Sequence, residues 1–436
     1  PVGILDADFI SEVNFYSGAF PVNRANALSS VLDFRLRDGS LDKNTVKATL
    51  GASEVALGAN GHIGNKTTYL VSVRRSYLQL LFRMLKMPFL PTFTDAQFKI
   101  KHRFSREHEL TVLGLGAIDD MKLNDDTDAE DESKQYLLNY LPVIKQNTYT
   151  VGAVYRHTQG WNAQTFVVSR SFMNNKNTKF KDNDESSEDN LTLRYRSDEA
   201  ETRFRAENRT QFESFRLNAG VNLDFAMYDN RTFQRIFHPS EGAHTLQYAT
   251  DLSMVKWGVF ASGEYHKPET KYSLSAGIRV DANDYSSSMK NPFKQFSPRL
   301  SGSYELTDQW VLNASAGRFY QLPAYTTLGY RDLTGQLINR ENGIRYMQSD
   351  QVVGGLEYRM GWMSRISWEG FYKWYSQMPL SVFDNIPLSS KGTDYGVTGN
   401  EEVTSNARGR AYGTEVMIRW IDYDRFNLVS SYTYVR

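Results

Sequence analysis

Apolar and polar residues alternate along most of this chain. Between residues 270 and 281 every second side chain is apolar, and the side chains between them are small or charged. The apolar members are Tyr272, Leu274, Ala276, Ile278 and Val280, and the others are Ser273, Ser275, Gly277, Arg279 and Asp281. The segments 96–104 and 299–306 follow the same period of two. Successive side chains of a β-strand point to opposite faces, so these segments predict strands with one apolar and one polar face.

The connections between the predicted strands alternate in length. The short ones fall at 64–66, 105–108, 157–160, 212–215, 266–271, 307–309, 361–364 and 422–425. The long polar ones lie between them, at about 83–93, 120–148, 174–189, 229–248, 286–294, 322–349 and 379–406. A soluble β-sandwich or propeller mixes loop lengths, whereas a membrane barrel has tight turns at one rim and long loops at the other.

Strand length and aromatic content also favour a membrane barrel. Several predicted strands reach the ~9–11 residues that a tilted strand needs to cross a bilayer, whereas globular strands average about five or six. Aromatic residues gather near the strand ends, and Trp and Tyr are stable at the level of the lipid headgroups. They include Trp310, Phe319, Tyr320, Trp368, Tyr372, Trp374, Tyr375, Trp420 and Tyr423. We therefore predict an all-β fold, a transmembrane antiparallel β-barrel.

About seventeen barrel strands are predicted, and single-chain bacterial barrels have an even number. The predicted strands are 43–52, 55–63, 67–82, 94–104, 109–119, 149–157, 161–173, 191–211, 214–228, 249–264, 270–285, 295–306, 309–321, 350–360, 364–378, 407–421 and 425–436. The first residues also lack the basic and apolar regions of a secretory signal. We therefore expect a chain that is truncated at both ends and a barrel that is open or poorly closed.

Composition narrows the possible functions. Mean hydropathy is −0.52, and no run approaches the ~20 apolar residues of a membrane helix. The chain has no cysteine, which removes disulfides, cysteine metal sites and thiol catalysis. Its formal net charge of zero argues against a surface that binds nucleic acid through phosphate contacts.

The motifs of catalysis and metal binding are missing from the sequence. There is no H-E-x-x-H, P-loop or G-x-S-x-G motif, and His102 and His108 lack metal-ligand spacing. The acidic runs 124–132 and 182–189 suggest a divalent cation, but the first lacks the glycine of an EF-hand loop, and such runs are usually solvated. We expect no enzyme activity, no cofactor and no metal site.

The first forty residues differ from the wall. A strand from Phe9 is followed by a bend near Pro21, a stretch of small residues and a second strand over 31–37. The pattern I-x-x-V-x-x-Y-x-G at Ile10, Val13, Tyr16 and Gly18 resembles the end of the plug domain of TonB-dependent outer-membrane receptors. The usual glycines near 25–30 are alanine and serine here.

Barrel segments further along resemble the same family. They are Arg74 to Leu78, Phe296 to Leu300, Gly317 to Pro323, Gly354 to Glu357 and Gly409 to Glu415. The resemblance covers nearly the whole chain and implies a plugged barrel of the 22-stranded type. It implies the end of a plug at 1–40 and the barrel at 41–436, which lacks its last strands.

The resemblance implies active import of a scarce, large nutrient across the outer membrane of a Gram-negative bacterium. The substrate stays open among ferric siderophore, cobalamin, glycan and peptide. The implied partners are outer-membrane lipid, the nutrient ligand and a TonB-type energy-transducing complex, which would contact a segment upstream of Pro1. The alternatives are a passive porin, which would lack a plug, and a membrane-anchored binding or adhesion barrel.

Two sets of residues are candidates for function. The long connection 322–349 carries stacking faces and forked donors suited to an anionic or sugar-like ligand, at Tyr325, Tyr330, Arg331, Arg340, Arg345 and Tyr346. In the second plug strand, Arg35 and Arg37 alternate with apolar residues. We expect these two arginines to pair with inward carboxylates such as Glu305 or Glu369, or to remain hydrated.

Overall fold

The computed structural model describes residues 4–127, 131–238, 242–267, 269–361, 363–391, 397–422 and 426–436. Parts of the acidic run 124–132, of the long connections 229–248 and 379–406, and of the turns 266–271, 361–364 and 422–425 lie outside these residues. Within them, seventeen strands form one antiparallel barrel sheet, and a separate two-stranded sheet precedes it. The predicted fold class is confirmed.

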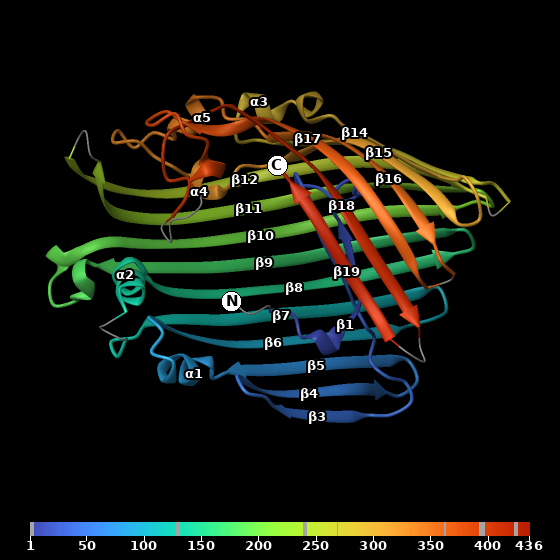
Figure 1. Ribbon diagram of the computed structural model, residues 1–436, viewed down its shortest axis with the longest axis horizontal. Coiled ribbons are helices and arrows are strands. Elements are labelled where there is room, and N and C mark those ends of the chain that lie inside the picture. The colour runs from blue at the N-terminus through green and yellow to red at the C-terminus, as the bar shows by residue number, and fades with distance from the viewer. Residues whose placement is uncertain are drawn as a thin grey trace.

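The barrel strands run consecutively around the sheet, and short turns and long connections lie at opposite ends of the strands (Figure 1). Their bounds are β3 (Thr45–Leu50), β4 (Glu54–Ile63), β5 (Thr67–Ser76), β6 (Phe89–Arg103), β7 (His108–Leu123), β8 (Val143–Gln159), β9 (Asn162–Phe180), β10 (Leu191–Gln211), β11 (Phe215–His238), β12 (Gly242–His266), β13 (Tyr272–Asn283), β14 (Ser297–Glu305), β15 (Trp310–Gln321), β16 (Met347–Arg359), β17 (Arg365–Ser381), β18 (Val403–Asp422) and β19 (Phe426–Val435). Each predicted barrel strand overlaps one of these.

The seam between the first and last strands differs from the rest of the wall. Strands that follow one another in the chain from β3 to β19 are joined in antiparallel register. The strand order places β19 beside β3 and so describes a closed barrel, not a fully open one. Among the described residues, however, no register joins β19 to β3, and every residue of β19 is exposed.

Side-chain exposure identifies the solvent outside the wall. On β13, Leu274 and Ile278 are 49% and 52% exposed, whereas the lumenal Arg279 is 3% exposed. A soluble sheet would bury its apolar face and leave its charges in water. The wall does the reverse, as expected when its outer face meets lipid and its inner face surrounds a polar lumen.

Two segments differ most from the sequence prediction. Residues 78–82, predicted as the end of a strand, lie in helix α1 (Leu78–Met84), because leucine, glutamine, arginine and methionine are strong helix formers. The predicted connection at 229–248 is largely strand, since β11 and β12 contain 24 and 25 residues. At about 3.4 Å per residue such strands measure roughly 80 Å. They therefore extend well beyond the hydrocarbon layer of about 30 Å.

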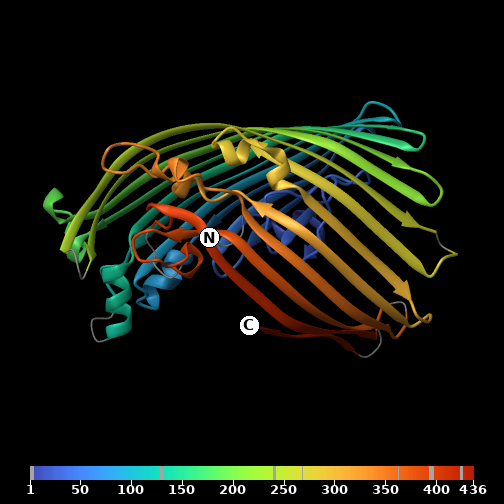
Figure 2. The same cartoon turned by 90° about the horizontal axis from the view of Figure 1, so that it is seen from above.

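The two strands predicted near the start of the chain are present as β1 (Ile10–Tyr16) and β2 (Val31–Leu36); they pair with each other and with no barrel strand among the described residues. Figure 2 shows this dark blue part of the chain beneath the arch of wall strands. Short helices lie mostly in the connections: η1 (Ala7–Phe9), α2 (Glu132–Tyr140), η2 (Lys181–Asn183), η3 (Glu188–Asn190), α3 (Ser287–Lys290), η4 (Pro292–Gln295), α4 (Tyr325–Leu328), α5 (Ile338–Glu341) and η5 (Leu388–Ser390). None of the described helices has the length and apolar character needed to cross a membrane.

Candidate ligand site in the barrel lumen

The lumen contains a polar cavity of about 290 Å³ near the long-loop end. Its walls come from three places: residues 23–26 between β1 and β2, the lumenal face of β9–β13, and Leu322 and Tyr346 of the long connection after β15. Charged side chains of both signs line it, namely Arg24, Arg203, Arg205, Asp224, Lys256, Arg279 and Asp281. All of them except Arg24 follow from the period of two, which points alternate side chains of each wall strand inward.

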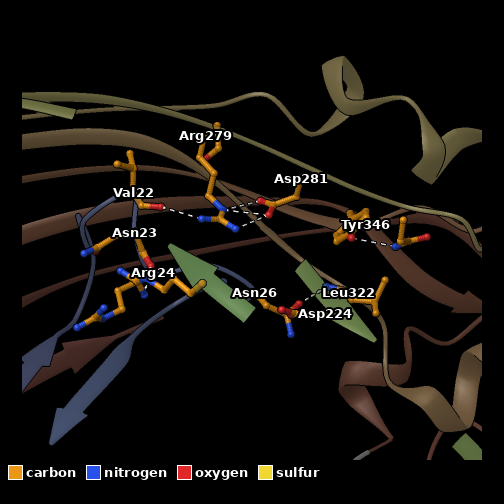
Figure 3. Close-up of polar contacts among 12 residues, drawn as sticks. Val22, Asn23, Arg24, Asn26, Asp224, Arg279, Asp281, Leu322 and Tyr346 are labelled. Atoms are coloured by element: carbon orange, nitrogen blue, oxygen red, sulfur yellow. Dashed lines mark hydrogen bonds and ion pairs between the residues drawn. The ribbon is translucent and has the colours of Figure 1, made fainter. Parts of the chain in front are cut away.

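One ion pair fixes the wall beside this cavity. The Arg279 guanidinium donates to Asp281 at 2.6 Å (Nη2 to Oδ1) and 2.8 Å (Nε to Oδ2). Its Nη1 also donates to the carbonyl of Val22 at 3.3 Å, as Figure 3 shows. A buried arginine needs such partners because an unpaired charge in the interior is costly.

A second network joins the wall to helix α4. Lys256 Nζ lies 2.7 Å from Glu201 Oε1 and donates to the Tyr325 hydroxyl at 3.0 Å. That hydroxyl donates in turn to Glu201. Burial, together with the neighbouring Glu201 carboxylate, raises the pKa of Tyr325. Tyr325 therefore stays protonated and holds α4 over the cavity.

Some oxygen atoms beside the cavity accept no hydrogen bond from the described residues. They are Oδ1 of Asn23, Asn222 and Asp224, all three buried. Leaving a buried acceptor without a donor costs about 1–3 kcal/mol. The wall of the cavity thus carries buried acceptors whose hydrogen bonds no described residue supplies.

Wall side chains hold the segment between β1 and β2 by its main chain. Arg299 Nη1 donates to the carbonyls of Phe20 at 2.8 Å, Pro21 at 2.6 Å and Arg24 at 3.1 Å. The Arg299 guanidinium also lies over the rings of Phe20 and Phe319, 4.8 and 4.6 Å from their centroids. Phe20 itself is fully buried.

Other wall strands grip the same N-terminal part of the chain. Lys373 Nζ on β17 donates to the carbonyls of Ser17 at 2.7 Å and Ser29 at 3.1 Å. From a separate part of the wall, Lys99 Nζ on β6 donates to the carbonyl of Leu36 at 2.6 Å. Because these contacts come from strands far apart around the wall, residues 17–36 lie across the lumen.

A larger cavity, of about 670 Å³, lies on the other side of the same turn. Residues 26–30 form one wall, and strands β17 and β18 with residues 387–390 form the other. Arg408 and Arg410 line it and have no acidic partner among the described residues. Tyr375 contributes an aromatic face and a hydroxyl, which lies 2.9 Å from Ser29 Oγ.

One hydrogen bond links the N-terminal segment to the long connection. The backbone N–H of Leu322 donates to Asn26 Oδ1 at 2.7 Å, and Asn26 has a φ of 54°. Asparagine tolerates this left-handed conformation better than most residues. Asn26 therefore adopts the backbone conformation that the turn needs and also accepts the hydrogen bond from Leu322.

Substitution of Asn26 by glycine should separate these two roles. Glycine adopts the left-handed backbone conformation but lacks the Oδ1 acceptor. Losing this hydrogen bond costs about 1 kcal/mol, so the Leu322 amide should exchange its hydrogen about fivefold faster. Asn26→Ala should exchange faster still because it also strains the turn. Hydrogen exchange followed by mass spectrometry measures both, and unchanged protection in Asn26→Gly would contradict the link.

The candidate residues of the long connection have different places. Tyr346 lines the small cavity and accepts a hydrogen bond from Asn283 at 2.9 Å. Tyr330 packs edge-on against Tyr248. Arg331 donates to Thr250 Oγ1 at 3.1 Å and to the carbonyl of Gly335 at 2.7 Å.

The two remaining arginines of that set are exposed. The Arg340 guanidinium lies 5.9 Å from the ring centroid of Tyr285, and the Arg345 amide donates to Ser405 Oγ at 2.9 Å. The structure thus brings Tyr325 and Tyr346 together at the lumen, with Tyr325 above the cavity and Tyr346 in its lining. The other four contact loop residues or the upper ends of β12 and β18.

The candidate contacts between the N-terminal segment and the wall differ from the prediction. Arg35 pairs with Glu12 of the neighbouring strand β1 at 3.0 Å, because the two face each other across the register. Glu305 pairs with Arg359 at 3.0 Å. Arg37 lines a small cavity with β3–β5, and Glu369 lines one beside residues 15–19. Among the described residues the wall therefore holds the segment mainly through cations that contact its carbonyls and carboxylates, and neither Glu305 nor Glu369 pairs with Arg35 or Arg37.

Sequence reasoning missed the residues that make most of these contacts. Arg279 stood in the alternating pattern, but its charge alone did not distinguish it from other lumenal residues. Arg299, Lys256 and Lys373 are likewise inward charges on predicted strands. Their partners depend on where residues 17–36 cross the lumen, which a single sequence does not give.

Comparison with known proteins identifies the barrel. Residues 92–436 match the family model described as TonB dependent receptor-like, beta-barrel. No curated protein sequence matches the chain.

Solved structures share its fold. A mutant of the ferric enterobactin receptor PfeA from Pseudomonas aeruginosa has a TM-score of 0.71 at 14% identity, covering 99% of this chain and 67% of that one. FpvAI in its complex with pyocin S2 has a TM-score of 0.71 at 12% identity, with 98% and 61% covered. The copper transporter OprC has a TM-score of 0.69 at 12% identity, with 98% and 67% covered. The chain thus spans roughly two thirds of the length of these structures.

Proposed function

The chain belongs to the TonB-dependent receptor-like β-barrel family, and from this premise we propose that it actively imports a scarce, large nutrient across the outer membrane of a Gram-negative bacterium. Receptors of this family are transporters rather than enzymes, so the expectation that the chain is not an enzyme is confirmed. In this proposal residues 4–40 are the end of the plug, and the long loops face the outside of the cell.

The observation that carries the proposal is the filled lumen. Residues 17–36 cross the barrel, and Lys99, Arg279, Arg299 and Lys373 hold their carbonyls from separate wall strands. A passive porin keeps a water-filled channel, whereas here the channel is occupied by a chain segment. Moving that segment requires breaking several charge-assisted hydrogen bonds, which is work that an energised partner would supply.

The two cavities favour a polar ligand. Five cations and two carboxylates line the small cavity, and Tyr375 offers a stacking face in the larger one. Of the candidate nutrients, a ferric siderophore carries both negative charge and many oxygen atoms. PfeA, whose name identifies a ferric enterobactin receptor, has the same fold.

Uptake by cells that express the native protein tests this proposal. Labelled ferric siderophores, cobalamin and oligosaccharides are offered to a strain with the gene and to one without it. We expect gene-dependent accumulation of a ferric siderophore that stops when a protonophore collapses the proton gradient. Gene-dependent uptake that continues unchanged under the protonophore would contradict active import and favour a porin.

A further inference from the structure

A histidine pair lies at the short-turn end of the wall, far from the lumenal cavities. His108 begins β7, and His157 lies near the end of β8, directly opposite it in the register. The two imidazole rings are stacked, with centroids 4.5 Å apart and planes inclined by 4°. Alternation along β8 places His157 on the same face as Tyr149 and Val151, which are 42% and 41% exposed. The pair therefore lies on the outer face of the barrel, at its rim.

Hydrogen bonds orient both rings in the same way. His108 Nδ1 lies 2.6 Å from the Tyr155 hydroxyl, and His157 Nδ1 lies 3.4 Å from Gln164 Oε1. Neither Nε2 atom has a hydrogen-bond partner among the described residues. A histidine that binds a metal through one nitrogen usually has its other nitrogen held by a polar group, and that bond fixes the ring.

A carboxylate completes the group. One ligand atom each from Glu107, His108 and His157 can be chosen so that all three lie within 4.8 Å of one another. Tetrahedral zinc, with bonds of about 2.0–2.1 Å, needs its ligand atoms roughly 3.3 Å apart. Small rotations of these side chains close that difference. The backbone is already joined here, since the Thr158 amide donates to the Glu107 carbonyl at 2.8 Å.

We propose that Glu107, His108 and His157 form a binding site for a divalent transition-metal ion, Zn²⁺ or Cu²⁺. Neutral imidazoles suit both ions, and the carboxylate supplies a third ligand and one negative charge. Water fills the remaining position. The bound ion joins the turn before β7 and the start of β7 to the end of β8. This site is independent of the proposed import function, because it uses no lumenal residue.

Metal titration of the full chain tests the site. The chain, carrying no histidine tag and held in detergent micelles at pH 7.5, is titrated with Zn²⁺ and Cu²⁺ in competition with a chromogenic chelator. We expect one equivalent to bind at this site, and His108→Ala or His157→Ala to weaken binding at least about tenfold. Tyr155→Phe should weaken binding by about tenfold, because it releases the His108 ring without removing a ligand.

His266→Ala is the matched control, since His266 ends β12 at the same rim and belongs to no metal-ligating group among the described residues. It should bind as the unmodified chain does. Circular dichroism confirms that each variant keeps its β-structure. Binding that is equal in the unmodified chain, His108→Ala and His157→Ala would overturn the proposal, and so would the lack of one-equivalent binding to the unmodified chain.

Discussion

A disulfide between cysteines at positions 22 and 277 is expected to stop import while it is oxidised and to restore import when it is reduced. Val22 lies in the lumenal segment and Gly277 on β13. A Cβ added at Gly277 would lie 2.7 Å from Val22 Cγ1 and 3.1 Å from Val22 Cγ2, and Val22 Cβ is not among the three nearest atoms. The two Cβ atoms are therefore about 3.1–4.2 Å apart, close to the range of about 3.5–4.5 Å that disulfides require.

The two introduced cysteines can form no other disulfide within this chain, because the chain has no cysteine of its own. A covalent link that ties the segment to the wall removes the movement that import requires, whatever the ligand. Ligand binding at the long-loop end should persist in the oxidised form, since neither residue lines the larger cavity. Uptake is measured with and without a reductant.

Cysteines at Ser273 and Ser303 provide the matched control. These residues lie opposite each other on β13 and β14, with hydroxyl oxygens 2.7 Å apart, so their disulfide joins wall to wall. Uptake should be nearly unchanged by this link. Normal uptake by the oxidised 22–277 variant would show that the segment does not have to leave its place.

Replacing Arg299 by methionine is expected to loosen the lumenal segment strongly. The substitution keeps much of the apolar length but removes the donor to three carbonyls. Hydrogen bonds from charged groups contribute about 1.5–3 kcal/mol each. All three carbonyls share the two hydrogens of one Nη1, so we take the loss as that of about two bonds, about 3 kcal/mol, which would raise the opening of residues 20–24 about 100-fold. Hydrogen exchange at these residues measures the opening.

Arg299→Lys and Arg359→Met separate the possible causes. Lysine keeps the charge but not the planar fork, so an intermediate increase is expected. Arg359 is also lumenal, but it pairs with Glu305 and Glu357 and donates no side-chain hydrogen bond to the described N-terminal segment. Its replacement should leave residues 20–24 protected. Equal exchange in Arg299→Met and Arg359→Met would mean that lumenal charge alone, not the contact with the carbonyls, holds the segment.

Most of the wall could be predicted from the sequence, because each strand encodes its own two faces. The inward Arg279 and outward Ile278 are distinguished by the period of two alone. The prediction failed where that signal weakens: β11 and β12 continue above the membrane, where both faces carry polar side chains, and α1 consists largely of helix formers beside a strand.

The sites were harder to predict because they depend on contacts between distant segments. Tyr325 is a candidate because an aromatic residue in a long loop offers a stacking face, and its contact with a ligand stays a prediction. Arg299 was not, since its partners are carbonyls of residues 20–24, which any side chain could carry. His157 was missed for a related reason, because only the register of β7 and β8 places it opposite His108.

The measurement that tests the central claim most directly is the rate at which maleimide modifies a single cysteine at position 22 in living cells. Val22 is 2% exposed in the resting structure, so modification should be slow in cells whose proton gradient has been collapsed. In energised cells supplied with the imported nutrient, the rate should rise strongly as the segment leaves its carbonyl contacts. Equal rates in the two conditions would contradict the claim that residues 17–36 are a plug that moves during import.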